Sequence, residues 1–526
     1  GFPRHAHEAP TGELLRVIEE PDAPEQIIDN LITEAGLPVA FPPAVDQEMA
    51  GLPTEVSSAD PELPRVDQRD LPFVTIDGED ARDFDDAVCL QKQAKGFLRL
   101  WVAIADVAEY VRLGSAVDAS AWERGTSVYF PSRVIPMLPE ALSNGLCSLQ
   151  QGKPRLALTC EMTLDSKGEV QDYAIYPALI QSRARLTYTQ VSNLLAGDTK
   201  AVPDTALHIM LREMGALAKV MRARREVRGA LRLMLPEAKV DLDEQGQPTA
   251  LRKVYPSDAT GLIEQFMLEA NETVARHCTQ QKIPILFRVH DPPPLDQTQQ
   301  LEGFLGRLGF ALPKDLFTEP GRLNEVLKQV EKHPLRDQIE LALLKSLSQA
   351  RYRETNDGHF GLAATHYAHF TSPIRRYPDL MLHRALKQRW ASSKRLPPVS
   401  PGAGLHLSTR ERLAGACSSQ VERLYRVLYM ERFLGQTFRA TVSSASDKGL
   451  WVALVEEFVE GALPMEALRD GRYRFDRQRG VITGQGKRRD VGPGTKLTVR
   501  LANADRAAQL LEFDLITWDW SEVAAG

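Results

Sequence analysis

The chain has 526 residues, of which 43% are hydrophobic and 25% are charged, and its formal net charge of −6 by itself argues against a nucleic-acid partner. This length predicts about three or four globular domains. The sequence has no apolar run of about eighteen residues and no signal peptide at its start, so we expect a cytoplasmic protein without a membrane span. Five widely spaced cysteines without a CxxC pattern argue against disulfides and zinc ribbons.

The first predicted element is a helix at 24–36, where apolar residues recur at helical spacing and a glycine ends the run. Residues 65–391 mix strands and helices, which is typical of an α+β domain; the clearest are strands at 98–105 and 155–162 and helices at 204–227, 261–278 and 336–348. Four arginines within residues 221–228 predict a basic helix face, either solvated or able to bind a polyanion.

Six carboxylates stand within the ten residues Asp77–Asp86, against a single Arg82. Carboxylates at this density repel one another unless cations neutralise them, and hard oxygen ligands favour Mg²⁺ or Mn²⁺ over zinc. A solvated acidic loop is the ordinary alternative, but apolar strand-like stretches flank the run and Phe84 lies within it. An EF-hand loop is excluded, because Ala81 and Arg82 stand where it needs a ligand and a glycine.

After a breaker-rich loop at 392–404, Ser408 and Thr409 can cap a long helix that reaches Gly435. Short strands separated by glycine turns follow, and their spacing is typical of an OB barrel: 437–442, 449–454, 459–463 and 495–500.

Between two of these strands, Arg469–Arg489 carries seven arginines and one lysine, with Tyr473 and Phe475 among them. Basic side chains follow phosphates and aromatic rings stack on bases, so this segment is a candidate RNA-binding loop. A solvated hairpin is the alternative. The residues assigned to RNA here are Arg472, Tyr473, Arg474 and Arg477.

Two sequence blocks resemble the signatures of the ribonuclease II/ribonuclease R family of 3′-to-5′ exoribonucleases. The first is FVTIDGEDARDFDDAV (73–88), and the second is HFTSPIRRYPDLMLHRALK (369–387). Stretches at 125–149, 262–275 and 358–363 are similar to family sequences in the same order. The resemblance covers residues 65–526.

The resemblance implies an α+β fold in three parts. Residues 65–434 would form an RNB-type catalytic domain, and residues 435–526 an OB barrel that binds RNA. Relatives usually carry one or two cold-shock barrels ahead of the catalytic domain, and residues 1–64 are too short for two. We therefore expect a short, partly helical N-terminal module, either a truncated cold-shock barrel or a helix-turn-helix-like unit.

Hydrolysis of a phosphodiester needs an activated water and neutralisation of charge, which two Mg²⁺ ions can supply. The resemblance implies that four aspartates hold this two-ion site, with Mn²⁺ as a substitute: Asp77, Asp83, Asp85 and Asp86. It also implies catalytic roles for Asp85, Asp86 and Arg375, with Asp85 the most sensitive. Pro373 stiffens the turn so that the Arg375 guanidinium can meet a phosphate; a surface ion pair is the ordinary alternative.

The resemblance further implies RNA contacts for Tyr129, Arg376 and Glu422. Tyr129 matches an aromatic residue that stacks on the 3′-terminal bases, whereas residues 231–235 lack the aromatic partner that the family places there. A place in the core is the alternative for Tyr129, and an i,i+4 ion pair with Arg426 is the alternative for Glu422.

We therefore predict a Mg²⁺-dependent enzyme, a processive and hydrolytic 3′-to-5′ exoribonuclease that releases nucleoside 5′-monophosphates from single-stranded RNA. Stacking and phosphate contacts need no sequence readout, and 2′-hydroxyl contacts exclude DNA. We expect a monomer. Two alternatives belong to other classes: a catalytically silent RNA-binding protein, against which the four motif aspartates argue, and a metal phosphatase for small molecules, against which the barrel argues.

Overall fold

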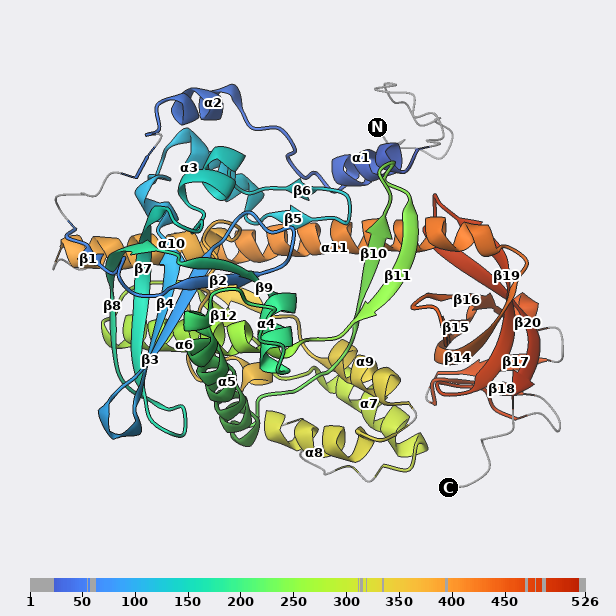
Figure 1. Cartoon of the computed structure of the whole chain (residues 1–526). Coiled ribbons are helices and arrows are strands. Elements are labelled where there is room, and N and C mark those ends of the chain that lie inside the picture. Colours follow the sequence, from blue (N-terminus) through green and yellow to red (C-terminus); the bar gives the residue numbers. More distant parts are fainter. Residues whose placement is uncertain are drawn as a thin grey trace.

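The chain is organised as a body built around a large sheet, a long helix that crosses the molecule, and a barrel near the C-terminus (Figure 1). The computed structural model describes residues 23–53, 55–56, 63–310, 312, 316–317, 319–333, 335–392, 396–468, 472–477, 479–484 and 489–519. Within these ranges, no helix combines the length and the apolar character that a membrane crossing needs.

Seven strands form the sheet of the body, in the order β1-β8-β7-β4-β3-β2-β9. Neighbouring strands are antiparallel except that β1 is parallel to β8 and β2 to β9. β4 lies at the centre, and its residues 100–105 are all buried, as is typical of an apolar strand that is covered on both faces. The bounds are Val66–Asp67 (β1), Val74–Asp77 (β2), Asp86–Lys92 (β3), Leu98–Ala105 (β4), Pro154–Leu164 (β7), Val170–Gln181 (β8) and Ala184–Thr187 (β9).

Helices pack on this sheet, and three two-stranded pairs accompany it. α5 and α6 pack on each other and contact β2, β3 and β4. The helices of the body are Ala116–Arg124 (α3), Tyr188–Leu195 (α4), His208–Arg228 (α5), Asp258–Gln280 (α6) and Tyr377–Ala391 (α10). The strand pairs are Val128–Tyr129 (β5) with Val134–Ile135 (β6), Glu237–Leu242 (β10) with Pro248–Val254 (β11), and Phe287–Val289 (β12) with Arg351–Arg353 (β13).

Most of the arginines predicted to form a basic face on α5 are paired with acids of α6, and Arg225 is buried. Arg225 forms an ion pair of 2.6 Å with Glu269 of α6, and Arg228 forms one of 2.7 Å with Glu272. Arg224 also pairs with Glu269. The sequence did not reveal this, because the acids are about 45 residues away on a helix that packs against α5.

A cluster of three helices has a hydrophobic core of its own and lies beside the barrel and the end of α5 (Figure 1). It consists of Leu295–Arg307 (α7), Pro320–Val330 (α8) and Arg336–Ser346 (α9). Its buried residues include Leu305, Leu323 and Ile339.

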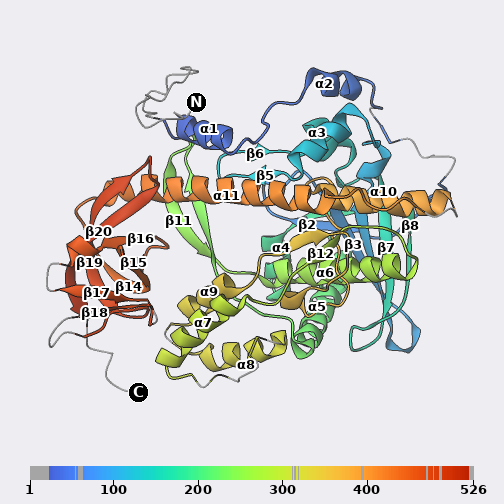
Figure 2. The ribbon, with the colours of Figure 1, turned by 180° about the vertical axis from the view of Figure 1, so that it is seen from behind.

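Helix α11 (Ala403–Met430) runs across the molecule from the region of α10 to the barrel, as both ribbon views show (Figures 1 and 2). It begins five residues before Ser408, so the predicted cap at Ser408 is wrong. The Ser408 hydroxyl instead donates to Gly404 O at 2.7 Å and accepts from the backbone N–H of Tyr352 in β13 at 2.8 Å. The serine therefore ties α11 to the body.

The C-terminal barrel is closed, in the order β14-β15-β16-β20-β19. The sequence predicted four of these strands and missed β20, and the hairpin of β17 and β18 lies inside the predicted basic loop. The α+β fold with a C-terminal OB-type barrel is confirmed. The bounds are Thr437–Ser446 (β14), Gly449–Leu454 (β15), Glu460–Pro464 (β16), Tyr473–Asp476 (β17), Val481–Gly484 (β18), Lys496–Asp505 (β19) and Leu510–Asp519 (β20).

The described residues of the N-terminal segment hold two helices, Pro24–Glu34 (α1) and Pro43–Ala50 (α2), and no strand. α1 packs on α11, where Ile28 and Ile32 share a buried cluster with Tyr425, whereas α2 packs on α3. These two helices therefore do not form a helix-turn-helix-like unit, because α1 packs on α11 and α2 packs on α3. The module is partly helical, as predicted.

Glycine 404 allows α11 to approach β13, and this contact can be tested. A Cβ at position 404 would lie 2.5 Å from Tyr352 O, whereas a Cβ at Gly415, on the same helix, would meet nothing within 4 Å. We expect Gly404→Ala to destabilise the protein by about 1–3 kcal/mol. Gly415→Ala should stabilise it by up to about 1 kcal/mol through helix propensity. Thermal unfolding of the two variants checks this, and equal shifts would contradict the close approach.

Candidate active site

The acidic run occupies the connection between two neighbouring strands of the sheet. Asp77 is the last residue of β2 and Asp86 the first residue of β3. Ser148 holds the turn between them: its hydroxyl donates to Arg82 O at 2.6 Å and accepts from the backbone N–H of Phe84 at 3.1 Å. The turn therefore keeps four aspartates at one edge of the sheet instead of leaving them on a free loop.

The second sequence block meets the acidic run at Asp85. The backbone N–H of Ile374 donates to Asp85 Oδ1 at 2.9 Å, across 289 residues of sequence. Arg375 Nε lies 3.8 Å from Asp85 Oδ2, and Arg375 Nη2 donates to Ser372 Oγ at 3.0 Å. The Asp85 side chain is 6% exposed and that of Arg375 is 44% exposed, so the guanidinium faces the open side of the cluster.

The electrostatics of the cluster reflect a surplus of negative charge. Burial raises the pKa of Asp85 well above its usual range, and the positive charge of Arg375 offsets part of this increase. Burial and then the charge of Asp77 raise the pKa of Asp86 to about 7. The pKa of Asp77 is raised by burial and further by Asp83. Arg375 is the cation that most directly lowers the pKa of each of these three aspartates. The remaining negative charge would be stabilised by a further cation.

The aspartates suit a hard divalent cation by their chemistry. Carboxylate oxygens are the ligands of Mg²⁺ and Mn²⁺, and few protein donors occupy them: Asp77 accepts from Gly78 N at 2.7 Å and Asp83 from a tyrosine hydroxyl. Among the described side chains, however, no three of the types Asp, Glu, His and Cys already stand at the mutual spacing of a metal site. By their chemistry, the four aspartates fit a hard divalent cation.

Tyr129 lies beside the aspartates. Its hydroxyl donates to Asp83 Oδ2 at 3.1 Å, and its backbone oxygen accepts from Ser418 of α11 at 2.9 Å. The residue is 43% exposed, so it is not a core residue. The structure adds Tyr188, which follows β9 and whose pKa is raised by burial and then by Asp77 and Asp86. No local sequence pattern indicates Tyr188, because its proximity to the aspartates depends on the parallel pairing of β9 with β2.

Arg376 is less exposed than Arg375, and both Arg376 and Glu422 form ion pairs within the protein. Arg376 donates to Asp379 Oδ1 at 2.7 Å, and its side chain is only 16% exposed. Glu422 accepts from Arg426 at 3.2 Å, which is the ion pair considered as the alternative to an RNA contact. Glu422 follows Ser418 by one turn of α11, so it lies further along the helix that passes Tyr129.

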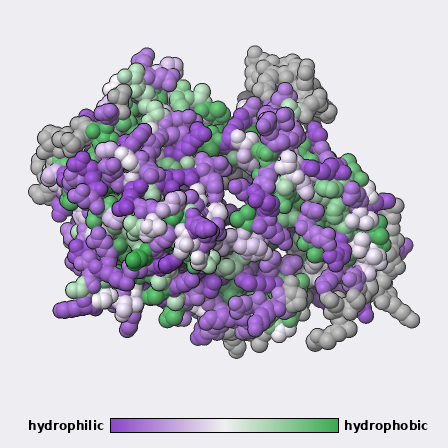
Figure 3. Space-filling view, in the orientation of Figure 1, coloured by the Kyte–Doolittle hydropathy of each residue, from purple (hydrophilic) through white to green (hydrophobic). Residues whose placement is uncertain are grey.

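The barrel candidates are not part of the aspartate cluster. Arg472, Arg474 and Arg477 are exposed on and beside the hairpin of β17 and β18, at the far end of the molecule from the sheet (Figure 1). The ring of Tyr473 lies 6.4 Å from that of Trp518. The space-filling view shows a hollow between the body and the barrel, bordered mostly by hydrophilic residues (Figure 3).

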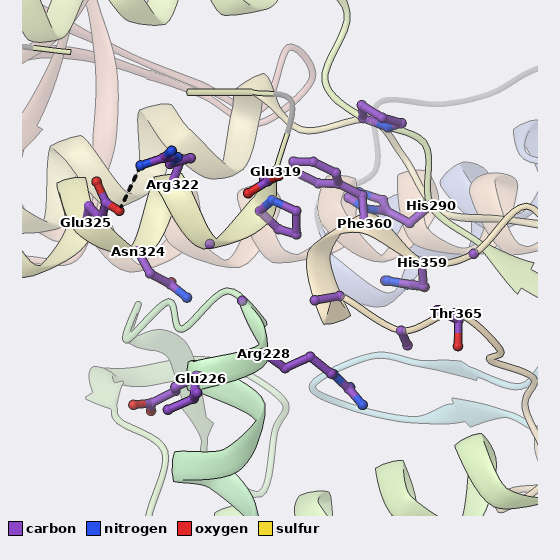
Figure 4. Close-up of a pocket in the computed structure, with 18 of the residues that line it drawn as sticks. Glu226, Arg228, His290, Glu319, Arg322, Asn324, Glu325, His359, Phe360 and Thr365 are labelled. Carbon is purple, nitrogen blue, oxygen red and sulfur yellow. Dashed lines mark hydrogen bonds and ion pairs between the residues drawn. The ribbon is translucent and has the colours of Figure 1, made fainter. Parts of the chain in front are cut away.

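A large hollow of about 890 Å³ lies elsewhere, between the end of α5, the start of α8 and residues 356–365 (Figure 4). Its charges are largely matched: Arg228 is paired with Glu272, and Arg322 lies 3.4 Å from Glu325. It does not contain the four aspartates, so we assign the chemistry to the aspartate cluster and not to this hollow.

Comparison with known proteins agrees with this geometry. The RNB domain matches residues 65–391, which is more than half of the chain. The chain belongs to the RNB family. Ribonuclease R of Escherichia coli is 39% identical over 520 residues, which are 96% of this chain and 64% of that protein. Ribonuclease R of Thermotoga maritima is 37% identical, over 97% of this chain and 73% of that protein.

A solved structure extends the comparison to the fold. Mycoplasma genitalium RNase R in complex with ribose-methylated single-stranded RNA matches this RNB-family chain with a TM-score of 0.87 and 27% identity. The match covers 94% of this chain and 78% of that one. The resemblance to the ribonuclease II/ribonuclease R family is thereby confirmed, although the chain spans only 64% of the length of the E. coli relative.

Metal binding by the aspartates can be measured without any turnover. We expect Mn²⁺ binding, followed by electron paramagnetic resonance, to weaken at least about tenfold in Asp85→Asn, the scale seen when even an outer partner of a metal ligand is lost. Asp80→Asn is the matched control, because Asp80 is an exposed acid of the same run. Equal weakening in both variants would mean that the ion responds only to net charge.

Proposed function

We propose that this RNB-family chain is a hydrolytic, processive 3′-to-5′ exoribonuclease that acts on single-stranded RNA with two Mg²⁺ ions. The observation that carries the proposal is the contact between the two sequence blocks at Asp85, through Ile374 N and Arg375 Nε. That contact brings one exposed guanidinium to the end of the sheet strands where the acidic run carries its four aspartates. Phosphoryl-transfer sites need this combination, because anionic ligands hold cations and an arginine stabilises the charge of the transferring group.

In the proposed reaction, a water oxygen attacks the phosphorus of the last phosphodiester. The bond from phosphorus to the 3′-oxygen of the preceding nucleotide breaks, and that oxygen leaves as a hydroxyl. The products are a nucleoside 5′-monophosphate and an RNA shorter by one residue. Asp77, Asp83, Asp85 and Asp86 would hold the ions, which when bound supply an activated water and neutralise phosphate charge.

The remaining residues orient the substrate. Arg375 is free to meet a phosphate on its exposed side, and its contact with Ser372 sets the direction of the guanidinium. Tyr129, beside Asp83 and partly exposed, would stack on a base near the 3′ end. Arg376 would support the turn of residues 371–376 through Asp379, and any contact of Arg376 or Glu422 with RNA is part of this proposal.

The barrel would bind RNA upstream of the catalytic cluster. We propose that residues 65–434 are the catalytic domain and residues 435–526 the RNA-binding barrel, with Arg472, Tyr473, Arg474 and Arg477 in contact with the strand. Exposed arginines and a hydrophilic hollow between the two parts support this path (Figure 3). A strand that spans both parts can be shortened repeatedly without leaving the protein, which is the physical basis for processive action.

Asp85→Asn tests the proposed chemistry. The substitution keeps the size of the side chain and removes a charge that holds the ions, so turnover of labelled single-stranded RNA should fall at least about 10³-fold. RNA affinity should stay within a few-fold, and Asp80→Asn should retain activity. EDTA should stop mononucleotide release by the wild-type protein. RNA binding without any release by the wild-type protein would instead identify a catalytically silent RNA-binding protein.

The triple variant Arg472→Ala, Arg474→Ala and Arg477→Ala tests the barrel. Each lost phosphate contact should lower the slope of log affinity against log salt by about 0.7, so the slope should flatten by up to about 2. Binding of long RNA should weaken, whereas oligonucleotides too short to reach the barrel should be cleaved at nearly the normal rate.

Arg439→Ala is the control for this variant, since Arg439 is an exposed barrel arginine that already pairs with Glu456. An unchanged salt slope in the triple variant would show that the hairpin is only solvated.

A further inference from the structure

A small basic hollow of about 250 Å³ lies between the end of α4, the middle of α5 and the start of α6. Three cations and one carboxylate contribute to its lining, with Leu195 and Gly215 among the other residues. The charged residues are Arg212, Lys219, Arg222 and Asp258. This hollow is separate from the aspartate cluster and from the barrel.

Only part of this positive charge is matched by the protein. Lys219 Nζ lies 3.5 Å from Asp258 Oδ2, a pair in which both side chains are more than half exposed. Within the described part of the chain, neither Arg212 nor Arg222 forms a hydrogen bond or an ion pair. Glu264, one turn further along α6, lies in the field of Arg222 without reaching ion-pair distance. The hollow therefore has a surplus of two positive charges.

The contrast with the rest of α5 makes this surplus unusual. Arg224, Arg225 and Arg228, on the same helix, are all paired with Glu269 or Glu272 of α6. The helix packing therefore provides carboxylates at ion-pair distance for the last three arginines of α5, and provides none for Arg212 and Arg222 beside the hollow.

The guanidinium of Arg222 lies against Gly261, in the space that a side chain at that position would occupy. A Cβ at position 261 would lie 2.0 Å from Arg222 Nη2, so any other residue would displace this arginine. Gly261 is in the first turn of α6, where a glycine costs about 1 kcal/mol relative to alanine. The N-terminus of a helix carries partial positive charge, so a guanidinium held against it is repelled unless an anion lies between them.

We propose that this hollow binds a phosphate group as its dianion, either inorganic phosphate or a phosphate monoester. The surplus positive charge of the lining matches the two charges of one such group, and arginine suits phosphate by its planar donor geometry. The volume admits a group of this size. α4 leads from Tyr188, at the aspartate cluster, to Leu195 at the hollow, so a nucleoside 5′-monophosphate released at the cluster is one local source. The binding itself does not depend on the proposed exoribonuclease activity.

Calorimetric titration of the full chain with inorganic phosphate and, separately, with adenosine 5′-monophosphate tests the site. We expect saturable binding of phosphate by the wild-type protein, weakened at least about tenfold in Arg222→Gln and in Arg212→Gln. Lys153→Gln, which removes an exposed charge elsewhere, should bind as the wild type does. Tighter binding of the nucleotide than of phosphate would identify the monoester as the ligand, equal binding would show that the phosphate group alone is recognised, and weaker binding would identify the free ion.

Two further variants separate this site from the aspartate cluster and from simple misfolding. Asp85→Asn should bind phosphate as tightly as the wild type, because the aspartates are not part of the hollow. Gly261→Ala keeps every charge but displaces the Arg222 guanidinium, so it should weaken phosphate binding while α6 gains helix propensity. Absence of saturable binding by the wild type up to about 10 mM phosphate, tenfold above a weak Kd of about 1 mM, would overturn the proposal. Equal weakening in Arg222→Gln and Lys153→Gln would do so as well.

Discussion

The hydrogen bond from Ile374 N to Asp85 Oδ1 is the contact on which the arrangement of the candidate active site depends. A buried carboxylate is costly unless donors and cations satisfy it, and here a backbone N–H and a neighbouring guanidinium do so. The same contact fixes the turn of residues 371–376 against the sheet edge. Arg375 is thereby directed to the open side of the cluster, while Arg376 points inward to Asp379.

The charge of this cluster explains why the protein combines an acidic centre with basic peripheral surfaces. Burial and mutual repulsion raise the pKa of three of the motif aspartates, and Arg375 offsets only part of this repulsion. A polyanionic substrate would be repelled by such a centre without cations. The barrel hairpin carries exposed arginines at a distance from this centre, so the net charge of −6 does not describe the local charge of either region.

Helix α11 connects these two regions. It contacts α1, β5, β11, β13 and the barrel strands β19 and β20, so one rigid element touches most parts of the molecule. Ser418 on this helix bonds to Tyr129, and Ser408 bonds to β13. The distance between the aspartate cluster and the barrel is therefore set by a helix and not by a flexible linker.

Much of this protein was determined by local sequence. The apolar run of β4, the helical spacing of α1 and α6 and the glycine-separated strands of the barrel each specify an element, because side-chain periodicity and turn residues act over a few positions. The density of carboxylates in Asp77–Asp86 likewise indicated a cation site without any structure. The two sequence blocks were sufficient to indicate the family.

Contacts between distant segments were decided by the tertiary structure alone. Helix packing paired Arg225 with Glu269 and left Arg222 unpaired, although the two arginines are only three residues apart on α5. The true start of α11 was also missed, because Ser408 bonds to β13 instead of capping the helix. Tyr188 reached the aspartates only through the pairing of β9 with β2. In each case the sequence supplied the chemical groups, and long-range packing, which no local pattern encodes, determined their partners.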